Sequence, residues 1–206
     1  MAITNSTIQG KVGNAIFYRV GRTSRVRSMP AGYLDANTLQ QQENRSRLRV
    51  ATRFYQCLVE TVLRDAWKVA VGESGVNGFN FFMKVNMMVF RPDGKIGDFS
   101  RLQLAVGMMQ KVDHLSAMVG DDDTVTLTWE NGPNLPSARV DDSLVVVVLY
   151  GNRSFTPVFV EIDGATRGDG KATFRLERKR GTAAHVYCFF REKEGKAYST
   201  SQYIRI

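Results

Sequence analysis

The residues of this sequence with the clearest chemical potential are the basic side chains near its start. Residues 1–53 hold nine Lys/Arg and two acidic residues, so they carry +7 of the chain's formal net charge of +8. Guanidinium groups bind phosphate and carboxylate oxygens through charge-assisted hydrogen bonds. Because the charge is concentrated in one quarter of the chain, we expect it to contact an acidic partner. The alternative is a basic surface without a specific partner. The candidate binding residues are Lys11, Arg19, Arg22, Arg25, Arg27, Arg45, Arg49 and Arg53.

Other reactive side chains do not form a catalytic or metal-binding pattern. His114 and His185 lack the Ser/Cys and acid arrangement of a triad. The run Asp121–Asp123 could attract a cation, but it lacks the spaced ligands of a calcium loop, so a polar turn is favoured. No Cys/His cluster and no phosphate-binding loop occurs. We therefore expect a protein that is not an enzyme and has no cofactor or metal.

Composition indicates an ordinary globular chain, with 43% hydrophobic and 23% charged residues. Cys57 and Cys188 stand far apart in apolar surroundings, which predicts two buried free thiols in a reducing compartment. The first ten residues lack the features of a signal peptide, and no apolar run reaches membrane-spanning length. We expect a soluble protein of the cytoplasm, or one incorporated in a particle assembled there, such as a virion.

The first element that must position the basic residues is a β-hairpin within a basic arm, residues 1–35. Two β-prone runs, 15–20 and 23–28, flank Gly21 and Arg22, a two-residue connection of the kind that hairpins favour. Strand alternation places Arg25 and Arg27 on one face. An isolated hairpin is only marginally stable in water, so this arm needs a surface to lie on.

The next predicted element is an antiparallel helical hairpin, residues 36–95. Apolar residues spaced by three and four predict one helix from residue 37 or 38 to about residue 71, followed by a second from 79 to 90. Arg45, Arg49 and Arg53 share another face of the first helix. Like charges spaced by four repel mildly, which makes a binding role there as plausible as a merely solvated helix face.

The third predicted part, residues 96–206, is an antiparallel β-sandwich, so the fold class is α+β. Short β-prone runs separated by turn residues support it, and the run 143–150 is apolar throughout, as in a central strand. The predicted strands are 101–106, 124–130, 143–150, 156–162, 172–177, 184–191 and 198–206.

Two resemblances follow from these residues. The run VTLTWE (125–130), the apolar strand and the run HVYCFFREKEGKAYSTSQYI (185–204) resemble a fibronectin type III or immunoglobulin-like module without its disulfide. The resemblance implies that Trp129 is a core residue and that Tyr187 and Phe189 point inward. It implies a binding surface or spacer and no particular activity.

Nearly the whole chain also resembles an uncharacterised family of bacterial proteins from gut Bacteroidetes. The shared features are a Gly-Lys-x-Gly-Asn start at residues 10–14, an Arg-rich helix, a segment around 79–86 and a Tyr-Ser-x-Ser-x-Tyr-like tail within 198–203. This resemblance supports the three-part architecture and implies no catalytic residue.

Two functions remain open. The first is a structural or assembly protein whose basic arm docks on a neighbouring subunit or another acidic partner, within a virion or other large particle. The second is sequence-independent nucleic-acid binding, in which the arginines contact phosphates and Phe17 or Tyr18 stacks on bases. We expect no small-molecule substrate. Binding to a membrane surface is disfavoured, because packing against the second helix explains the apolar stripe better.

Overall fold

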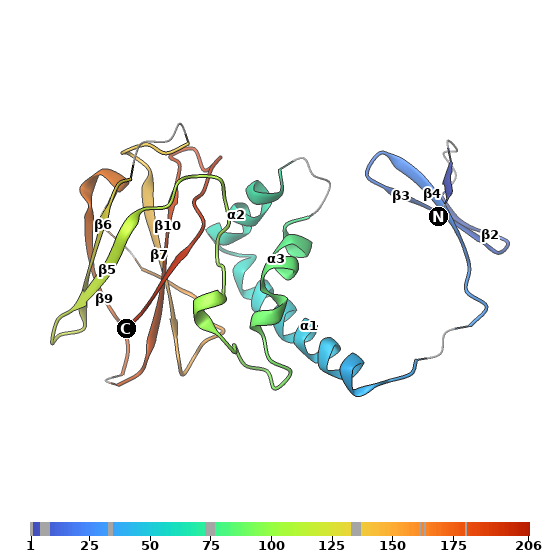
Figure 1. Ribbon diagram of the computed structural model, residues 1–206, viewed down its shortest axis with the longest axis horizontal. Helices are drawn as coiled ribbons and strands as arrows, with labels where there is room; N and C mark the ends of the chain where they lie inside the picture. Colours follow the sequence, from blue (N-terminus) through green and yellow to red (C-terminus); the bar gives the residue numbers. More distant parts are fainter. Residues whose placement is uncertain are drawn as a thin grey trace. The chain divides into compact units, whose positions relative to one another are not determined.

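The structure is a computed structural model that describes residues 2–4, 9–32, 35–72, 77–132, 137–160, 162, 164–179 and 181–206 (Figure 1). Within these residues, three α-helices accompany several antiparallel sheets, which confirms the predicted α+β class. The chain divides into two compact units, residues 1–41 and residues 42–206. The boundary falls in the first turn of the first helix.

The first unit contains one antiparallel sheet, here named the arm sheet. Its strands β1 (Ala2–Thr4), β2 (Gly10–Val12), β3 (Ala15–Val20) and β4 (Thr23–Ser28) lie in the order β1-β4-β3-β2. β3 pairs with β4 along its full length across the predicted connection, Gly21 and Arg22. Gly21 has a φ of +59° at the first turn position, where a type II′ turn needs glycine. β1 and β2 were not predicted.

The helical segment differs from its prediction at one point. Helix α1 (Leu39–Leu58) and helix α2 (Val62–Val71) replace the single helix predicted to reach residue 71, so that prediction was wrong. The break lies at Thr61, whose backbone is extended and whose hydroxyl donates to the Leu58 carbonyl and accepts from the Leu63 amide. Such local bonds compete with the helical ladder, and here they cap α2. The apolar stripe continues across the break, so the spacing of apolar residues in the sequence does not reveal it.

Helix α3 (Gly78–Asn86) ends four residues before its predicted end and continues as a 3₁₀ turn, η1 (Met87–Val89). The side chain of Asn86, fully buried, donates to the Gln103 carbonyl (3.0 Å) and accepts from the Gln103 amide (2.8 Å). These two bonds tie the end of the helix to a chain segment 17 residues later.

Two further sheets follow in the second unit. One has the order β11-β10-β7-β8 and the other the order β5-β6-β9, and every pairing in both is antiparallel. The strands are β5 (Asp113–Val119), β6 (Thr124–Glu130), β7 (Ser143–Tyr150), β8 (Val158–Val160), β9 (Lys171–Arg175), β10 (Ala184–Arg191) and β11 (Gln202–Arg205), with 3₁₀ turns η2 (Phe99–Arg101) and η3 (Arg167–Asp169).

The central strands β7 and β10 are buried on both faces. Their odd-numbered residues, such as Val147 and Tyr187, share a hydrophobic core with the helices. Their even-numbered residues, such as Val148 and Val186, share a second core with β6 and β9. Figure 1 shows this sheet between the helices and the β5-β6-β9 sheet. A strand with two buried faces needs no polar alternation, which explains the continuous apolar run of β7.

Aromatic rings fill the core beside the helices. Phe82 of α3 lies 6.3 Å from Phe54 of α1 and 5.2 Å from Trp67 of α2, measured between ring centroids. All three side chains are fully buried. Trp129, expected in the core, is buried in the second cluster, between the two sheets.

The strand predictions of the second unit were right for some runs and wrong for others. β6, β7 and β10 have the predicted bounds, whereas β8, β9 and β11 differ from theirs at one end or both. Residues 101–106 do not form a strand: η2 and irregular backbone occupy them, and the Leu104 amide donates to the Ser201 hydroxyl. β5 was missed, because an edge strand with mostly exposed side chains has little apolar periodicity.

Candidate basic binding surfaces

The arm sheet brings part of the predicted basic set onto one face. Residues directly opposite each other in an antiparallel pair project from the same face, as do residues two apart in one strand. Lys11 lies opposite Ile16, Ile16 opposite Arg27, and Tyr18 opposite Arg25. Lys11, Tyr18, Arg25 and Arg27 therefore share one face, here named the basic face.

An aromatic ring accompanies the cations on the basic face. The Arg27 guanidinium carbon lies 5.8 Å from the centroid of the Tyr18 ring, within the range of cation–π attraction. Tyr18 and Arg25 are half-buried, and Arg27 is exposed. Cations beside an aromatic ring can bind carboxylates or phosphates, and the ring can stack on a planar group.

The opposite side of the arm sheet carries Val12, Ala15, Phe17 and Val26, here named the apolar face. Val12 pairs with Ala15 and Phe17 pairs with Val26. None of the side chains in residues 9–32 is buried. Within residues 9–32, the arm sheet therefore has an apolar face but no core of its own.

The remaining two basic residues of the arm lie elsewhere. Arg19 pairs with Ser24 and projects from the side of the apolar face, while Arg22 occupies the turn between β3 and β4. Both are exposed. The structure therefore does not place Arg19 or Arg22 on the basic face.

The second basic surface is on α1, where Arg45, Arg49 and Arg53 are exposed. Their spacing of four places them along the side of the helix away from the buried residues Ala51 and Phe54. A shallow groove of about 680 Å³ follows this side, and it is lined by Arg45, Leu48, Arg49, Thr52, Arg53 and Gln56.

Arg47 does not belong to this stripe. Its guanidinium lies 3.8 Å from the Glu43 carboxylate and 3.4 Å from the Asn44 side-chain oxygen, on another side of α1. Its side chain is only 21% exposed. Of the four arginines in the first half of the helix, Arg47 thus interacts with side chains of the helix itself.

A smaller hollow of about 250 Å³ adjoins the α1 stripe. Arg49 and Arg53 line it together with Val50, Gly94 and Phe155. Phe155 comes from the loop between β7 and β8, about a hundred residues away in sequence, and no feature of the sequence linked it to the arginines. It adds an apolar wall beside two cations.

Several basic residues of the two surfaces have no carboxylate partner within the part of the chain that the structure describes. There, no carboxylate oxygen lies within 4.0 Å of the basic groups of Lys11, Arg19, Arg22, Arg27, Arg49 and Arg53. Lys11, Arg25 and Arg27 belong to the first compact unit, and Arg45, Arg49 and Arg53 belong to the second. The predicted basic binding residues therefore form two groups, one on each compact unit.

The other candidate residues are explained by their surroundings. His185 is buried, stacks on Phe99 with ring centroids 3.6 Å apart, and its Nδ1 lies 2.8 Å from the Tyr203 hydroxyl. Burial, helped by the charge of Arg205, holds the pKa of His185 below its ordinary value. His114 is exposed, 3.9 Å from the Glu130 carboxylate.

The two cysteines differ. Both are free, but Cys57 is exposed, so the prediction of two buried thiols was wrong for this residue. It lies on α1 outside the buried stripe of Ala51, Phe54 and Leu58. Cys188 is buried in β10, and burial raises the pKa of its thiol to about 12.

The described residues contain neither a metal-binding cluster nor a membrane-spanning helix. No group of three or more His, Cys, Asp or Glu side chains there could hold a metal ion. Nor does this part of the chain contain a helix with the length and apolar character needed to cross a membrane.

Comparison with known proteins identifies a family. Residues 7–205 match the family described as "Family of unknown function (DUF6266)". No curated protein and no solved structure matches the chain. The match runs from before β2 to the end of β11, so it includes most of the basic arm, the helices and both sheets of the second unit. This confirms the predicted resemblance to an uncharacterised family, and the chain belongs to DUF6266.

Proposed function

We propose that this protein is a non-enzymatic structural or assembly protein whose basic N-terminal arm docks on a neighbouring subunit. The observation that carries the proposal is the arm sheet. Strands β2, β3 and β4 carry an apolar face, yet no side chain in residues 9–32 is buried. A small sheet needs a packed face for stability, so another surface must cover it.

The two faces of the arm sheet suggest how a partner is recognised. Phe17 and Val26 supply apolar area to bury, which drives association without directionality. Lys11, Arg25 and Arg27 supply positive charge, which selects an acidic partner surface and orients it. We take the partner to be another copy of this chain, whose residues 54–206 carry 18 acidic side chains.

The finer architecture and the biological setting are part of the proposal. We propose that the two sheets of the second unit form a sandwich related to fibronectin type III and immunoglobulin-like modules, supported by the shared core around Trp129. We further propose a virion or another large particle assembled in the cytoplasm as the setting, in a bacterium of the gut Bacteroidetes or a virus that infects one.

Self-association tests the main proposal. Multi-angle light scattering of the full chain should give a mass above the 23.1 kDa of one copy, rising with concentration. Val26→Ser on the apolar face should weaken this association, because it removes apolar area from the contact. Val20→Ser is the matched control, since Val20 is exposed on the opposite side of the same sheet.

Two outcomes would contradict the proposal. One is a monomer mass at high concentration while the backbone amides of β3 and β4 remain protected from hydrogen exchange. The other is equal weakening by Val26→Ser and Val20→Ser.

Sequence-independent nucleic-acid binding is a second candidate, favoured by the line of Arg45, Arg49 and Arg53 along one side of α1. Each phosphate contact releases counterions, so affinity should fall steeply between about 50 and 200 mM salt. Titrations with short duplex DNA, single-stranded DNA and RNA measure this slope.

A charge-matched pair of variants tests the nucleic-acid candidate. The slope to compare is that of log affinity for duplex DNA against log salt concentration. Replacing Arg45, Arg49 and Arg53 by Gln should reduce its magnitude by about 3, or roughly 0.9 for each lost phosphate contact. The control replaces Arg64, Lys84 and Arg101, three exposed cations of the same unit, by Gln. Equal effects of the two triple variants would remove this candidate.

A further inference from the structure

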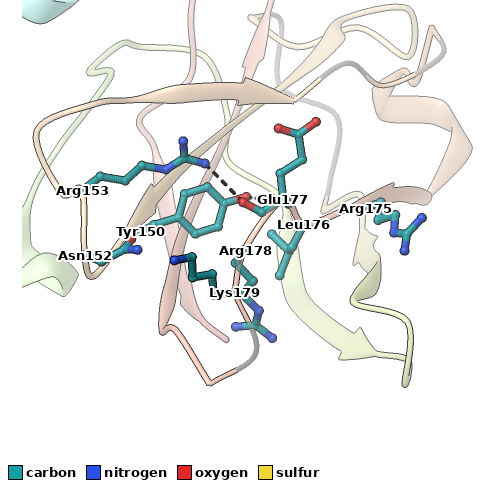
Figure 2. A pocket seen from close by; sticks show the side chains of 8 residues that line it. All are labelled: Tyr150, Asn152, Arg153, Arg175, Leu176, Glu177, Arg178 and Lys179. Carbon is teal, nitrogen blue, oxygen red and sulfur yellow. Dashed lines mark hydrogen bonds between the residues drawn. The ribbon is translucent and has the colours of Figure 1, made fainter.

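A pocket outside both basic surfaces lies where strands of the two sheets of the second unit end. It is lined by Tyr150, Asn152 and Arg153, at and after the end of β7, and by residues 175–179, at and after the end of β9 (Figure 2). Its volume is about 600 Å³. Small-molecule sites in proteins occupy about 300–1,000 Å³, so this pocket is of suitable size.

The wall formed by Tyr150 and Arg153 is held in place before any ligand arrives. The Arg153 guanidinium carbon lies 4.7 Å from the centroid of the Tyr150 ring. Its Nη2 donates to the Glu177 carbonyl oxygen (3.2 Å), and the Tyr150 hydroxyl accepts from the Glu177 amide (2.9 Å). Figure 2 shows the Tyr150 ring beside Arg153 and directed at the Glu177 backbone. An arginine fixed in this way loses less side-chain freedom on binding.

Arg178 anchors the other wall. It makes two bonds to one Asp123 carboxylate oxygen, at 2.8 and 3.0 Å, and its Nη1 donates to the carbonyls of Thr182 (2.9 Å) and Ile206 (3.3 Å). Its side chain is 13% exposed and its charge is balanced by Asp123. Arg178 therefore fixes the segment after β9 and leaves the neighbouring cations to face the pocket.

Three cations of the pocket have no carboxylate partner among the described residues. No such oxygen lies within 4.0 Å of Arg153, Arg175 or Lys179, and all three are exposed. Among the described residues that line the pocket, Glu177 is the only acidic one, and its carboxylate points away from Arg153 and Lys179 in Figure 2.

One further carboxylate lies nearby. Hydrogen bonds from Thr124 lower the pKa of Asp122, and the charge of Arg175 adds the smallest contribution. Asp122 is fully exposed, so water screens this interaction. The lining residues themselves carry four positive charges and one negative charge, and Asp123 balances one of the positive ones.

We propose that this pocket binds a small multivalent oxyanion, of the phosphate-ester or polycarboxylate class. Arginine and lysine donors recognise such oxygens, and an excess of about two positive charges suits a ligand that carries at least two negative ones. Asn152 adds an amide that can donate to a further oxygen. The proposal does not depend on the assembly role of the arm.

Calorimetric titration of the full chain with inorganic pyrophosphate and with citrate, at low salt, tests the site. We expect saturable binding of at least one of these probes with one site per chain. Lys179→Gln and Arg175→Gln should each weaken it about tenfold, as expected when one charge-assisted hydrogen bond is lost. Both side chains are exposed and neither lies within 4.0 Å of a carboxylate oxygen of the described residues, so neither change should disturb folding.

Lys84→Gln and Arg64→Gln provide the controls, because both remove an exposed charge from α2 or α3, outside the pocket. They should leave the affinity unchanged. The proposal is overturned if neither probe binds saturably, or if the control variants weaken binding as much as the pocket variants do. Val26→Ser in the arm should not change it either, which separates this test from that of the assembly proposal.

Discussion

Arg167 connects several parts of the second unit through its buried side chain and its backbone carbonyl. Its guanidinium lies 3.3 Å from the Asp142 carboxylate, 4.3 Å from the centroid of the Phe190 ring, and donates to the Gln110 carbonyl at 2.7 Å. Its own carbonyl accepts from the indole of Trp129. Burial lowers the pKa of Arg167 and the Asp142 charge opposes that shift. Through its guanidinium and its backbone carbonyl together, Arg167 thus links both sheets and the segment before β5.

Asp142→Ala should be strongly destabilising. The side chains of Arg167 and Asp142 are 4% and 1% exposed, so the variant leaves a buried charge without its partner. Breaking such a pair costs about 3–5 kcal/mol in unfolding free energy, which urea denaturation measures. Asp141→Ala is the control, because Asp141 is exposed and the change should stay within about 0.5 kcal/mol. Equal stability of the two variants would show that the pair contributes nothing.

His185 predicts how stability depends on pH. Its pKa in the folded protein lies below the ordinary value of 6.5, so the unfolded chain takes up this proton more readily. The free energy of unfolding should therefore fall as the pH drops below about 6.5, by at most about 1.4 kcal/mol per pH unit from this group.

The control for this pH dependence is the second histidine. His185→Gln should flatten the pH slope between about pH 6.5 and pH 5.5, whatever its effect on absolute stability. His114→Gln, which removes the exposed histidine, is the variant for comparison. If the pH slope persisted in His185→Gln and disappeared in His114→Gln, the pH dependence would come from His114 and the prediction would be wrong.

At the level of elements, the arm sheet depends on its turns more than the other sheets do. Hydrogen bonds and cross-strand pairs hold it together, and no residue within 9–32 is buried. Its stability is therefore sensitive to changes of a few tenths of a kcal/mol that a packed sheet would tolerate.

Gly21→Ala should loosen the arm sheet without destabilising the second unit. Alanine at a φ of +59° costs about 1 kcal/mol, and no heavy atom lies within 4 Å of the added carbon, so strain is the only expected effect. Hydrogen exchange of the β3 and β4 amides should accelerate about fivefold. Gly32→Ala is the control, because Gly32 has no positive φ and equal space around it. Unchanged exchange in Gly21→Ala would contradict this account of the turn.

The elements also show what the sequence could predict. β6, β7 and β10 have the predicted bounds because their apolar patterns are strong and turn residues flank them. The break before α2 could not be predicted, since it depends on two local bonds of the Thr61 side chain within an unbroken apolar stripe. The shared face of Arg25 and Arg27 followed from alternation, whereas the addition of Lys11 required β2, a strand of three residues.

The same limit applies to the sites. The spacing of Arg45, Arg49 and Arg53 predicts their alignment on one side of a helix. Phe155 beside them, and the pocket around Tyr150, depend on contacts between segments distant in sequence. Local sequence patterns therefore predicted which charged residues lie on one side of an element. The tertiary structure was needed to show which residues line the same pocket.

For the whole molecule, the division into two compact units predicts where proteolysis begins. The described residues between β4 and α1 are exposed and outside regular structure. Loops of this kind are the preferred sites of cleavage. Brief digestion of the full chain with a protease of broad specificity should therefore cut first between residues 29 and 38, as mass spectrometry of the fragments would show. A first cut within β6, β7 or β10 would contradict this prediction.

The strand β10, buried on both faces, has a consequence for how the chain finds a single pairing. A slip of one residue would exchange its two sides, although nearly every residue in the strand is apolar. Tyr187 would then leave the helices, and its hydroxyl would lose the Phe99 carbonyl to which it donates at 2.7 Å. An unsatisfied buried hydroxyl costs about 1–3 kcal/mol. The Tyr187 hydrogen bond therefore favours the observed register, whereas the hydrophobicity of the strand alone would allow either of its sides to face either core.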